Sequence, residues 1–183
     1  MSITSRTSRL PRRTYAIVHL SRQNFRADDD MDFADCMGAV AESVCAMDLG
    51  TVFAYTRGTS IDVLVADPSD HGVQPWFEGD VSKILSLSAS LATSVLHAHR
   101  PGCGALFGAQ VSTLTSFSEV ADHFIRRQGS TRGGGLVTVL VAEEAAKVKP
   151  STWQWDTRPA PRFHVGPGGW LANVVPTLDE TCS

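Results

Sequence analysis

The chain has 183 residues, of which 43% are hydrophobic and 19% are charged, and its formal net charge is −3. This composition indicates one globular domain with a sizeable core, and the acidic balance does not favour broad, nonspecific binding of nucleic acid. Apolar runs fall short of the roughly 18 residues of a membrane span, so we expect no membrane partner and a cytoplasmic location. The four cysteines show no CxxC spacing, which indicates neither a zinc site nor a disulfide framework. Residues 1–13 carry four arginines and no acid, and we expect them to form a disordered tail.

Alternating apolar residues predict a first strand over residues 14–21. One face of this strand is apolar throughout, and the other face carries Tyr15, Ile17, His19 and Ser21. Helical spacing of apolar residues then predicts a helix over residues 30–48, after the acidic run Asp28 to Asp30. Residues 51–57 and 61–67 alternate again and are joined by a glycine-containing turn, which predicts a β-hairpin.

The central helix follows the turn WFEG and ends near His99, because Pro101-Gly102 stops it. One stripe of this helix faces the core, and a second stripe consists of Lys83, Ser86, Ser90, Ser94 and His97. A helix shaped only for solubility usually carries Glu, Lys and Gln on its outer face. Small hydroxyls beside one lysine fit either close packing of a neighbouring element or contact with phosphate oxygens.

Residues 105–114 are predicted to form a fourth strand, and Ser116 with Glu119 forms a capping box that opens a helix to about residue 128. The order β-α-β-β-α-β followed by a helix predicts an α+β fold: a ferredoxin-like or palm antiparallel sheet with helices on one face. We assign this domain to residues 14–148, although residues 136–148 fit either a strand or a helix. Residues 149–183 are rich in proline and tryptophan and are predicted to be an irregular extension packed on the domain, with Trp153, Trp155 and Trp170 docking on the core rather than stacking on bases.

Four blocks in this order resemble the tRNA-His guanylyltransferase family, including its Thg1-like branch, which adds nucleotides in the 3′-to-5′ direction. The central helix WFEGDVSKILSLSASLAT resembles the family's helix "KIxSxxAS", and GALFGAQV resembles its strand "ALFDARV". VADHFIRRQGSTR is similar to the helix "VxxYFxWRQxDAxR", and FAYTRGTSIDVLV is similar to the hairpin "xAYxxSDEISLLL". The resemblance implies a palm fold, a nucleoside triphosphate (GTP or ATP) and a tRNA as partners, and a homo-oligomer, either dimer or tetramer.

The residues that would hold metal ions depart from the family pattern. Nucleotidyl transfer uses two Mg²⁺ ions held by carboxylates, which the family takes from a "DGRxF" turn and from the "SDE" hairpin. Ser21, Thr59 and Ser60 stand at these three positions, and Asn24 and Phe25 follow in the first motif. Hydroxyls alone are poor Mg²⁺ ligands. We therefore expect no bound metal cofactor, unless Mg²⁺ arrives with the nucleotide.

The phosphate-handling residues match the family better. Lys83, Ser86, Ser90, Arg127 and Arg132 match family positions and have the chemistry to hold a triphosphate, and the resemblance adds Asn24 and Phe25 to this set. Gly133 to Gly135 fits either a phosphate cradle or a flexible loop.

Catalytic groups are harder to assign, and three residues are candidates: His19, Ser21 and Asp62. His19 with Ser21 or Cys103 could form a pair of base and nucleophile, but the sequence identifies no acid to orient the histidine. Asp62 lies two residues beyond Ser60, about 6.6 Å further along the strand, and is too far displaced to replace a metal ligand. The sequence therefore predicts a divergent Thg1-like protein that binds a purine nucleotide or an RNA 5′ end without two-metal transfer. It leaves open an active nucleotide-processing enzyme and a structural subunit of an oligomer.

Overall fold

The computed structural model of the chain describes residues 8–23, 33–47, 50–66, 76–129, 134–142, 153–164 and 169–178. Its centre is a six-stranded sheet in which every neighbouring pair of strands is antiparallel, with the order β4-β1-β3-β2-β5-β6. The strands are β1 (Tyr15–Gln23), β2 (Thr51–Arg57), β3 (Ser60–Ala66), β4 (Leu106–Leu114), β5 (Leu136–Ala142) and β6 (Trp153–Pro159). The first four strands have the order 4-1-3-2 of a ferredoxin-like sheet, as the sequence predicts.

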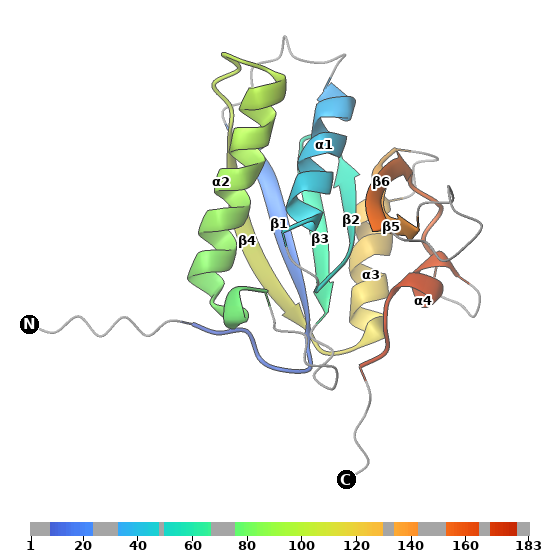
Figure 1. Cartoon of the computed structure of the whole chain (residues 1–183). Coiled ribbons are helices and arrows are strands. Elements are labelled where there is room, and N and C mark those ends of the chain that lie inside the picture. Colours follow the sequence, from blue (N-terminus) through green and yellow to red (C-terminus); the bar gives the residue numbers. More distant parts are fainter. Residues whose placement is uncertain are drawn as a thin grey trace, which may run out of the picture.

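Helices cover both faces of the sheet, whereas the sequence predicted helices on one face. The helices α1 (Phe33–Cys45) and α2 (Val81–His99) lie side by side in front of the sheet in Figure 1. The helix α3 (Phe117–Gln128) and the short helix α4 (Trp170–Val174) pack on the opposite face. The extra layer forms because the second face of the sheet is also apolar along most of its length.

Strand alternation divides the buried side chains into two cores. Ala16, Val18 and Leu20 of β1 point to the core beneath α1 and α2. Tyr15 and Ile17 point the other way, to a core of aromatic rings built around Phe53 and closed by residues of α3 and α4. The two-residue period of a strand therefore places His19 and Ser21 on the α3 face.

The helix α2 begins at the N-cap Asp80, whose carboxylate accepts hydrogen bonds from the amides of Ser82 at 3.0 Å and Lys83 at 3.1 Å. The preceding 3₁₀ helix η1 (Trp76–Gly79) carries three residues with positive φ, Phe77, Glu78 and Gly79, and they make a sharp turn into the helix. By length and composition alone α2 could cross a membrane, with 22% of its most apolar window buried. In the fold it packs against α1 and β4 and turns its polar stripe outward.

The C-terminal extension is more regular than the sequence predicted. Residues 136–142 form β5 and residues 153–159 form β6, so the extension adds an edge strand to the sheet. Trp170 stacks against Phe163, with ring centroids 5.6 Å apart, and Trp155 packs against the core beneath α1. Both tryptophans are half-buried against the domain.

Candidate functional site

The three hydroxyl positions of the degenerate metal motif meet at one end of the sheet. Ser21 of β1 lies opposite Ser60 of β3 on one side and opposite Gly108 of β4 on the other. Thr59 is in the hairpin turn, and its carbonyl oxygen accepts a hydrogen bond from the amide of Arg22 at 3.0 Å. The structure therefore brings Ser21, Thr59 and Ser60 together at the end of β1.

Asp62 is the centre of a network of side chains that lies two residues further into the sheet than Ser60. It lies opposite His19 on β1 and has no exposed surface. His19 Nδ1 donates a hydrogen bond to Asp62 Oδ1 at 2.5 Å, and Arg127 Nε donates to the other carboxylate oxygen at 2.5 Å. Arg127 Nη2 also donates to the hydroxyl of Ser60. One buried carboxylate thus fixes a histidine and an arginine beside the hydroxyl positions.

The carboxyl of Asp62 is held in its ionised form. Burial raises the pKa of Asp62, but the hydrogen bonds from His19 and Arg127 and the charge of Arg127 outweigh burial and hold the pKa well below its ordinary value. His123 Nε2 lies 3.8 Å from the same carboxylate, which is beyond hydrogen-bond distance, so we assign the effect to the two closer partners. Because an ionised carboxylate can only accept, the proton of the 2.5 Å contact is on Nδ1 of His19.

The C-terminal end of α3 is anchored to the hairpin as well. Nη1 of Arg57 donates to the carbonyl oxygens of Arg127 at 2.5 Å and Gln128 at 2.9 Å, which satisfies two groups at the end of the helix. This contact places Arg127 over the sheet. Sequence reasoning missed Arg57 and His123, although His123 and Arg127 stand four residues apart and so share one face of α3.

The predicted polar stripe of α2 lies elsewhere. α2 covers the sheet face opposite α3, and its first turn is bonded to residues 8–10, which lead into the other end of β1. Lys83 and Ser90 are exposed and have no partner among the described residues. The hydroxyl of Ser86 donates to the carbonyl oxygen of Ser82 at 2.8 Å, so its proton is used within the helix. Lys83 and Arg127 therefore do not form one surface in a single chain.

The predicted pairs of nucleophile and base are not formed. Cys103 packs against the core beneath α1 and α2, on the other side of the sheet from His19. Ser21 shares the face of His19 but is two residues away, about 6.6 Å along the strand, and its hydroxyl accepts a hydrogen bond from Gln23 at 3.1 Å. The acid that the sequence did not identify is Asp62, which orients His19.

The glycine run has a packing role where it is described. A Cβ atom on Gly135 would lie 2.5 Å from the ring of Tyr55, and the Tyr55 hydroxyl donates to the carbonyl oxygen of Gly134 at 3.2 Å. Close approach of a strand to an aromatic ring therefore explains Gly135. The remaining predicted positions lie outside the described residues: Asn24, Phe25, Asp28 to Asp30, Arg132 and Gly133.

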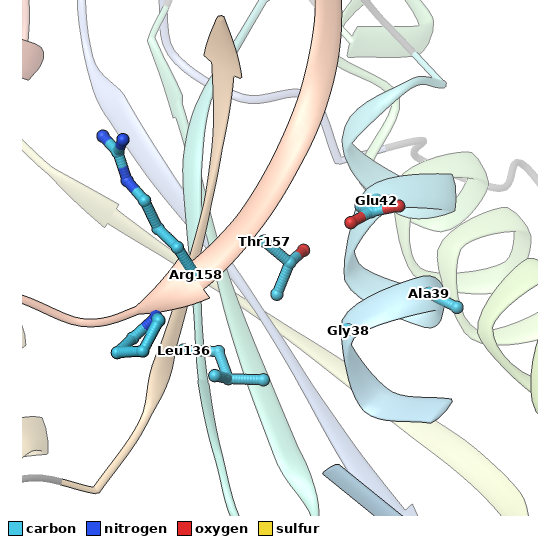
Figure 2. Close-up of a pocket in the computed structure, with 7 residues that line it drawn as sticks. Gly38, Ala39, Glu42, Leu136, Thr157 and Arg158 are labelled. Atoms are coloured by element: carbon cyan, nitrogen blue, oxygen red, sulfur yellow. The ribbon is translucent and has the colours of Figure 1, made fainter. Parts of the chain in front are cut away.

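A hollow of about 310 Å³ lies on the opposite sheet face, between α1 and the paired ends of β5 and β6. Figure 2 shows Thr157 pointing toward Gly38 of α1, while the side chain of Arg158 extends away from the helix. Gly38 permits this approach, since a Cβ there would lie 3.2 Å from Thr157. Glu42 is the charged side chain beside the hollow on α1, and an acidic wall does not suit a triphosphate.

Solved structures provide the comparison with known proteins. A bacterial tRNA-His guanylyltransferase (Thg1)-like protein in complex with GTP matches at a TM-score of 0.70 and 21% identity, over 82% of this chain and 84% of that chain. The bacterial Thg1-like protein in complex with ATP matches at a TM-score of 0.68 and 21% identity, over 83% of this chain and 86% of that chain. The tRNA-His guanylyltransferase of Saccharomyces cerevisiae matches at 0.57 and 14% identity, over 68% of this chain and 61% of that chain.

The sequence gives no further match: no family model matches it, and neither does any curated protein. At 21% identity, structural likeness establishes the fold. The resemblance read from the four sequence blocks predicted the same fold, and that prediction is confirmed. The chain has the palm-like fold of the Thg1-like tRNA-His guanylyltransferases.

Proposed function

We propose that this chain is a divergent Thg1-like protein that binds a purine nucleoside triphosphate, or the triphosphate end of an RNA, without the two-metal transfer of that family. The bacterial proteins with this fold are complexes with GTP and with ATP, which supports a nucleotide as the ligand. The four sequence blocks that match the family in order support the same relationship.

The main observation in support of this proposal is the network of side chains around Asp62. Three carboxylates and two Mg²⁺ ions would occupy this end of the sheet in a two-metal enzyme. Here the three positions are Ser21, Thr59 and Ser60, and the cation beside them is Arg127, held by Asp62. A guanidinium binds phosphate oxygens directly, with charge-assisted hydrogen bonds. We infer that Arg127 takes the role of neutralising the triphosphate that metal ions otherwise have.

The local charge fits an anionic ligand. Two cationic side chains, Arg57 and Arg127, lie at the hairpin, and the carboxylate that neutralises part of their charge is Asp62. His19 and His123 lie on either side of that carboxylate. The hydroxyls of Ser21 and Thr59 add no charge and can donate to phosphate oxygens, whereas the hydroxyl of Ser60 donates to the carbonyl oxygen of Arg57 at 3.0 Å. An Mg²⁺ ion would enter such a site with the nucleotide. Lys83 and Ser90, on the other side of the sheet, stay predicted as a separate phosphate contact.

Calorimetric titration of the protein with GTP and with ATP tests the proposal, in buffers with Mg²⁺ and with EDTA. We expect micromolar binding that changes little when EDTA replaces Mg²⁺, because the binding cation is an arginine. The variant Arg127→Met should weaken binding by about 10- to 100-fold, since it removes hydrogen bonds to a charged group. Arg127→Lys should retain part of the affinity, because it keeps the charge and loses the planar fork.

Arg126→Met is the matched control for this titration. Arg126 is the neighbouring residue on α3 and is exposed, and among the described residues its one hydrogen-bond partner is the carbonyl oxygen of Asp122 in its own helix, at 3.1 Å. Its removal should leave the affinity unchanged. Absence of nucleotide binding in either buffer, loss of binding in EDTA, or equal effects of the two arginine variants would each refute the proposal.

A further inference from the structure

We infer that His19 is a metal-independent general base, oriented by Asp62, which activates water for hydrolysis of the nucleotide that binds beside it. This inference rests on the proposed nucleotide site and adds a reaction to it. The hydrogen bond of 2.5 Å between Nδ1 and the buried carboxylate fixes both the position of the ring and its tautomer. In the neutral form of this ring, the unprotonated nitrogen is Nε2.

Nε2 of His19 is available to a substrate. The side chain of His19 is 31% exposed, whereas Asp62 has no exposed surface. No partner of Nε2 is found in the part of the chain that the structure describes. A buried acid, an oriented imidazole and a free second nitrogen are the arrangement by which a histidine accepts a proton from an attacking hydroxyl.

The position of His19 places this base next to the proposed phosphate site. His19 and Ser21 are on the same face of β1, and Ser21 lies opposite Ser60, whose hydroxyl is bonded to Arg127. Arg127 has two further donors on Nη1 with no partner among the described residues, and these can hold a phosphate oxygen as charge develops on it. His19 and Arg127 thus lie on two sides of the position proposed for the triphosphate.

The proposed reaction is hydrolysis of a phosphoanhydride bond of the nucleotide. A water oxygen forms a bond to a phosphorus atom of the triphosphate, and the proton of that water moves to Nε2 of His19. The bond from this phosphorus to the bridging oxygen breaks, and the electron pair leaves on the departing phosphate. The imidazolium then returns its proton to solvent. Asp62 stays ionised throughout and is a positioning residue, because it does not touch the reacting atoms.

Turnover of GTP in EDTA, followed by separation of the nucleotide products and assay of released phosphate and pyrophosphate, tests this inference. The wild-type protein should release product, with a rate that rises with pH as the base loses its proton. Asp62, Arg127, His123 and Tyr55 face the same region, so the pH profile is compared with that of the His19→Gln variant. This variant should lower kcat by about 10²- to 10⁴-fold and lose the rise with pH, while nucleotide affinity holds.

Two further variants separate a catalytic role from a structural one. His19→Ala should regain part of its activity when imidazole is added to the buffer, which a merely structural histidine would not do. Asp62→Asn should lower kcat and also raise KM, because the carboxamide no longer fixes the reactive tautomer of His19 or the position of Arg127. His99→Gln is the matched control, since His99 is an exposed histidine at the end of α2 without a partner among the described residues.

The outcomes also separate this inference from the proposed function. Nucleotide binding without turnover, or turnover that His19→Gln leaves intact, overturns the general base and leaves the nucleotide site standing. Turnover that requires added Mg²⁺ also overturns it. Absence of nucleotide binding overturns both.

Discussion

Asp62 has no exposed surface, yet it lies only two residues from Ser60, the first residue of β3 after the hairpin turn. A buried carboxylate without partners would destabilise the fold, and removing one partner of a buried ion pair lowers stability because it leaves an uncompensated charge. His19 and Arg127 remove that cost by occupying one carboxylate oxygen each. The same hydrogen bonds hold His19 and Arg127 in fixed positions near Ser60. At the scale of residues, the site is therefore a carboxylate that positions two nitrogen-bearing side chains.

The ionised state of Asp62 predicts a pH dependence of stability. Its pKa is lower in the folded chain than in the unfolded chain, so its contribution is present above the ordinary carboxyl pKa of about 3.9 and is lost as pH falls below it. The difference in free energy of unfolding between the wild type and Asp62→Asn should be largest at pH 5 to 7 and should shrink toward pH 3. Urea titrations across this range measure it. A difference that stays constant with pH would contradict the assignment, and Asp122→Asn, on the exposed side of α3, is the control.

At the scale of elements, the packing of α3 across the second sheet face brings Arg127 to Asp62 and Ser60 of β3, and this contact completes the candidate site. Arg57 ties the end of α3 to the hairpin, and the aromatic rings of Phe53 and Phe124, with centroids 4.6 Å apart, fix its middle. The strand β5 completes this core, because Gly135 lets the chain pass close to Tyr55. Gly135 thus serves the packing of the aromatic core.

The variant Gly135→Ala tests the role of this glycine. Its Cβ would lie 2.5 Å from the ring of Tyr55, which the core cannot relieve without shifting β5 or the ring. We expect a loss of about 1 to 3 kcal/mol in the free energy of unfolding, as for other overpacked cores. Gly108→Ala is the matched control, because its Cβ would meet only the flexible end of Gln23 at 3.3 Å. Equal stability of the two variants would refute the packing role.

The elements were largely readable from the sequence, and the site was not. The alternation gives the faces of β1 and β2 and the bounds of β2, while β1 continues two residues beyond its predicted end at Ser21. The face of His19 follows from this alternation. The pairing of His19 with Asp62 depends on the register between β1 and β3, which a single sequence does not define. The contact of Arg127 with Asp62 depends in addition on α3 crossing to the second face, and helices were expected on one face only.

At the scale of the whole molecule, the sheet separates two polar regions. The region of Asp62 and Arg127 lies between β3 and α3, whereas Lys83, Ser86 and Ser90 are exposed on α2. Figure 1 shows α2 and α3 on opposite sides of the sheet. One bound triphosphate can contact only one of these two regions, because they lie on opposite sides of the sheet. We propose that the triphosphate binds at Arg127, at the end of β1 where Ser21 and Ser60 meet. The carboxylates of two-metal transfer are absent from these aligned positions, and a carboxylate-held arginine stands next to them.

A crystal structure of the protein grown with GTP in the presence of EDTA tests this claim most directly. The account predicts triphosphate oxygens within hydrogen-bond distance of Arg127 and close to His19, with no metal ion between phosphate and protein. A triphosphate bound at Lys83 on the outer side of α2, or one that is ordered only when Mg²⁺ is supplied, would contradict it.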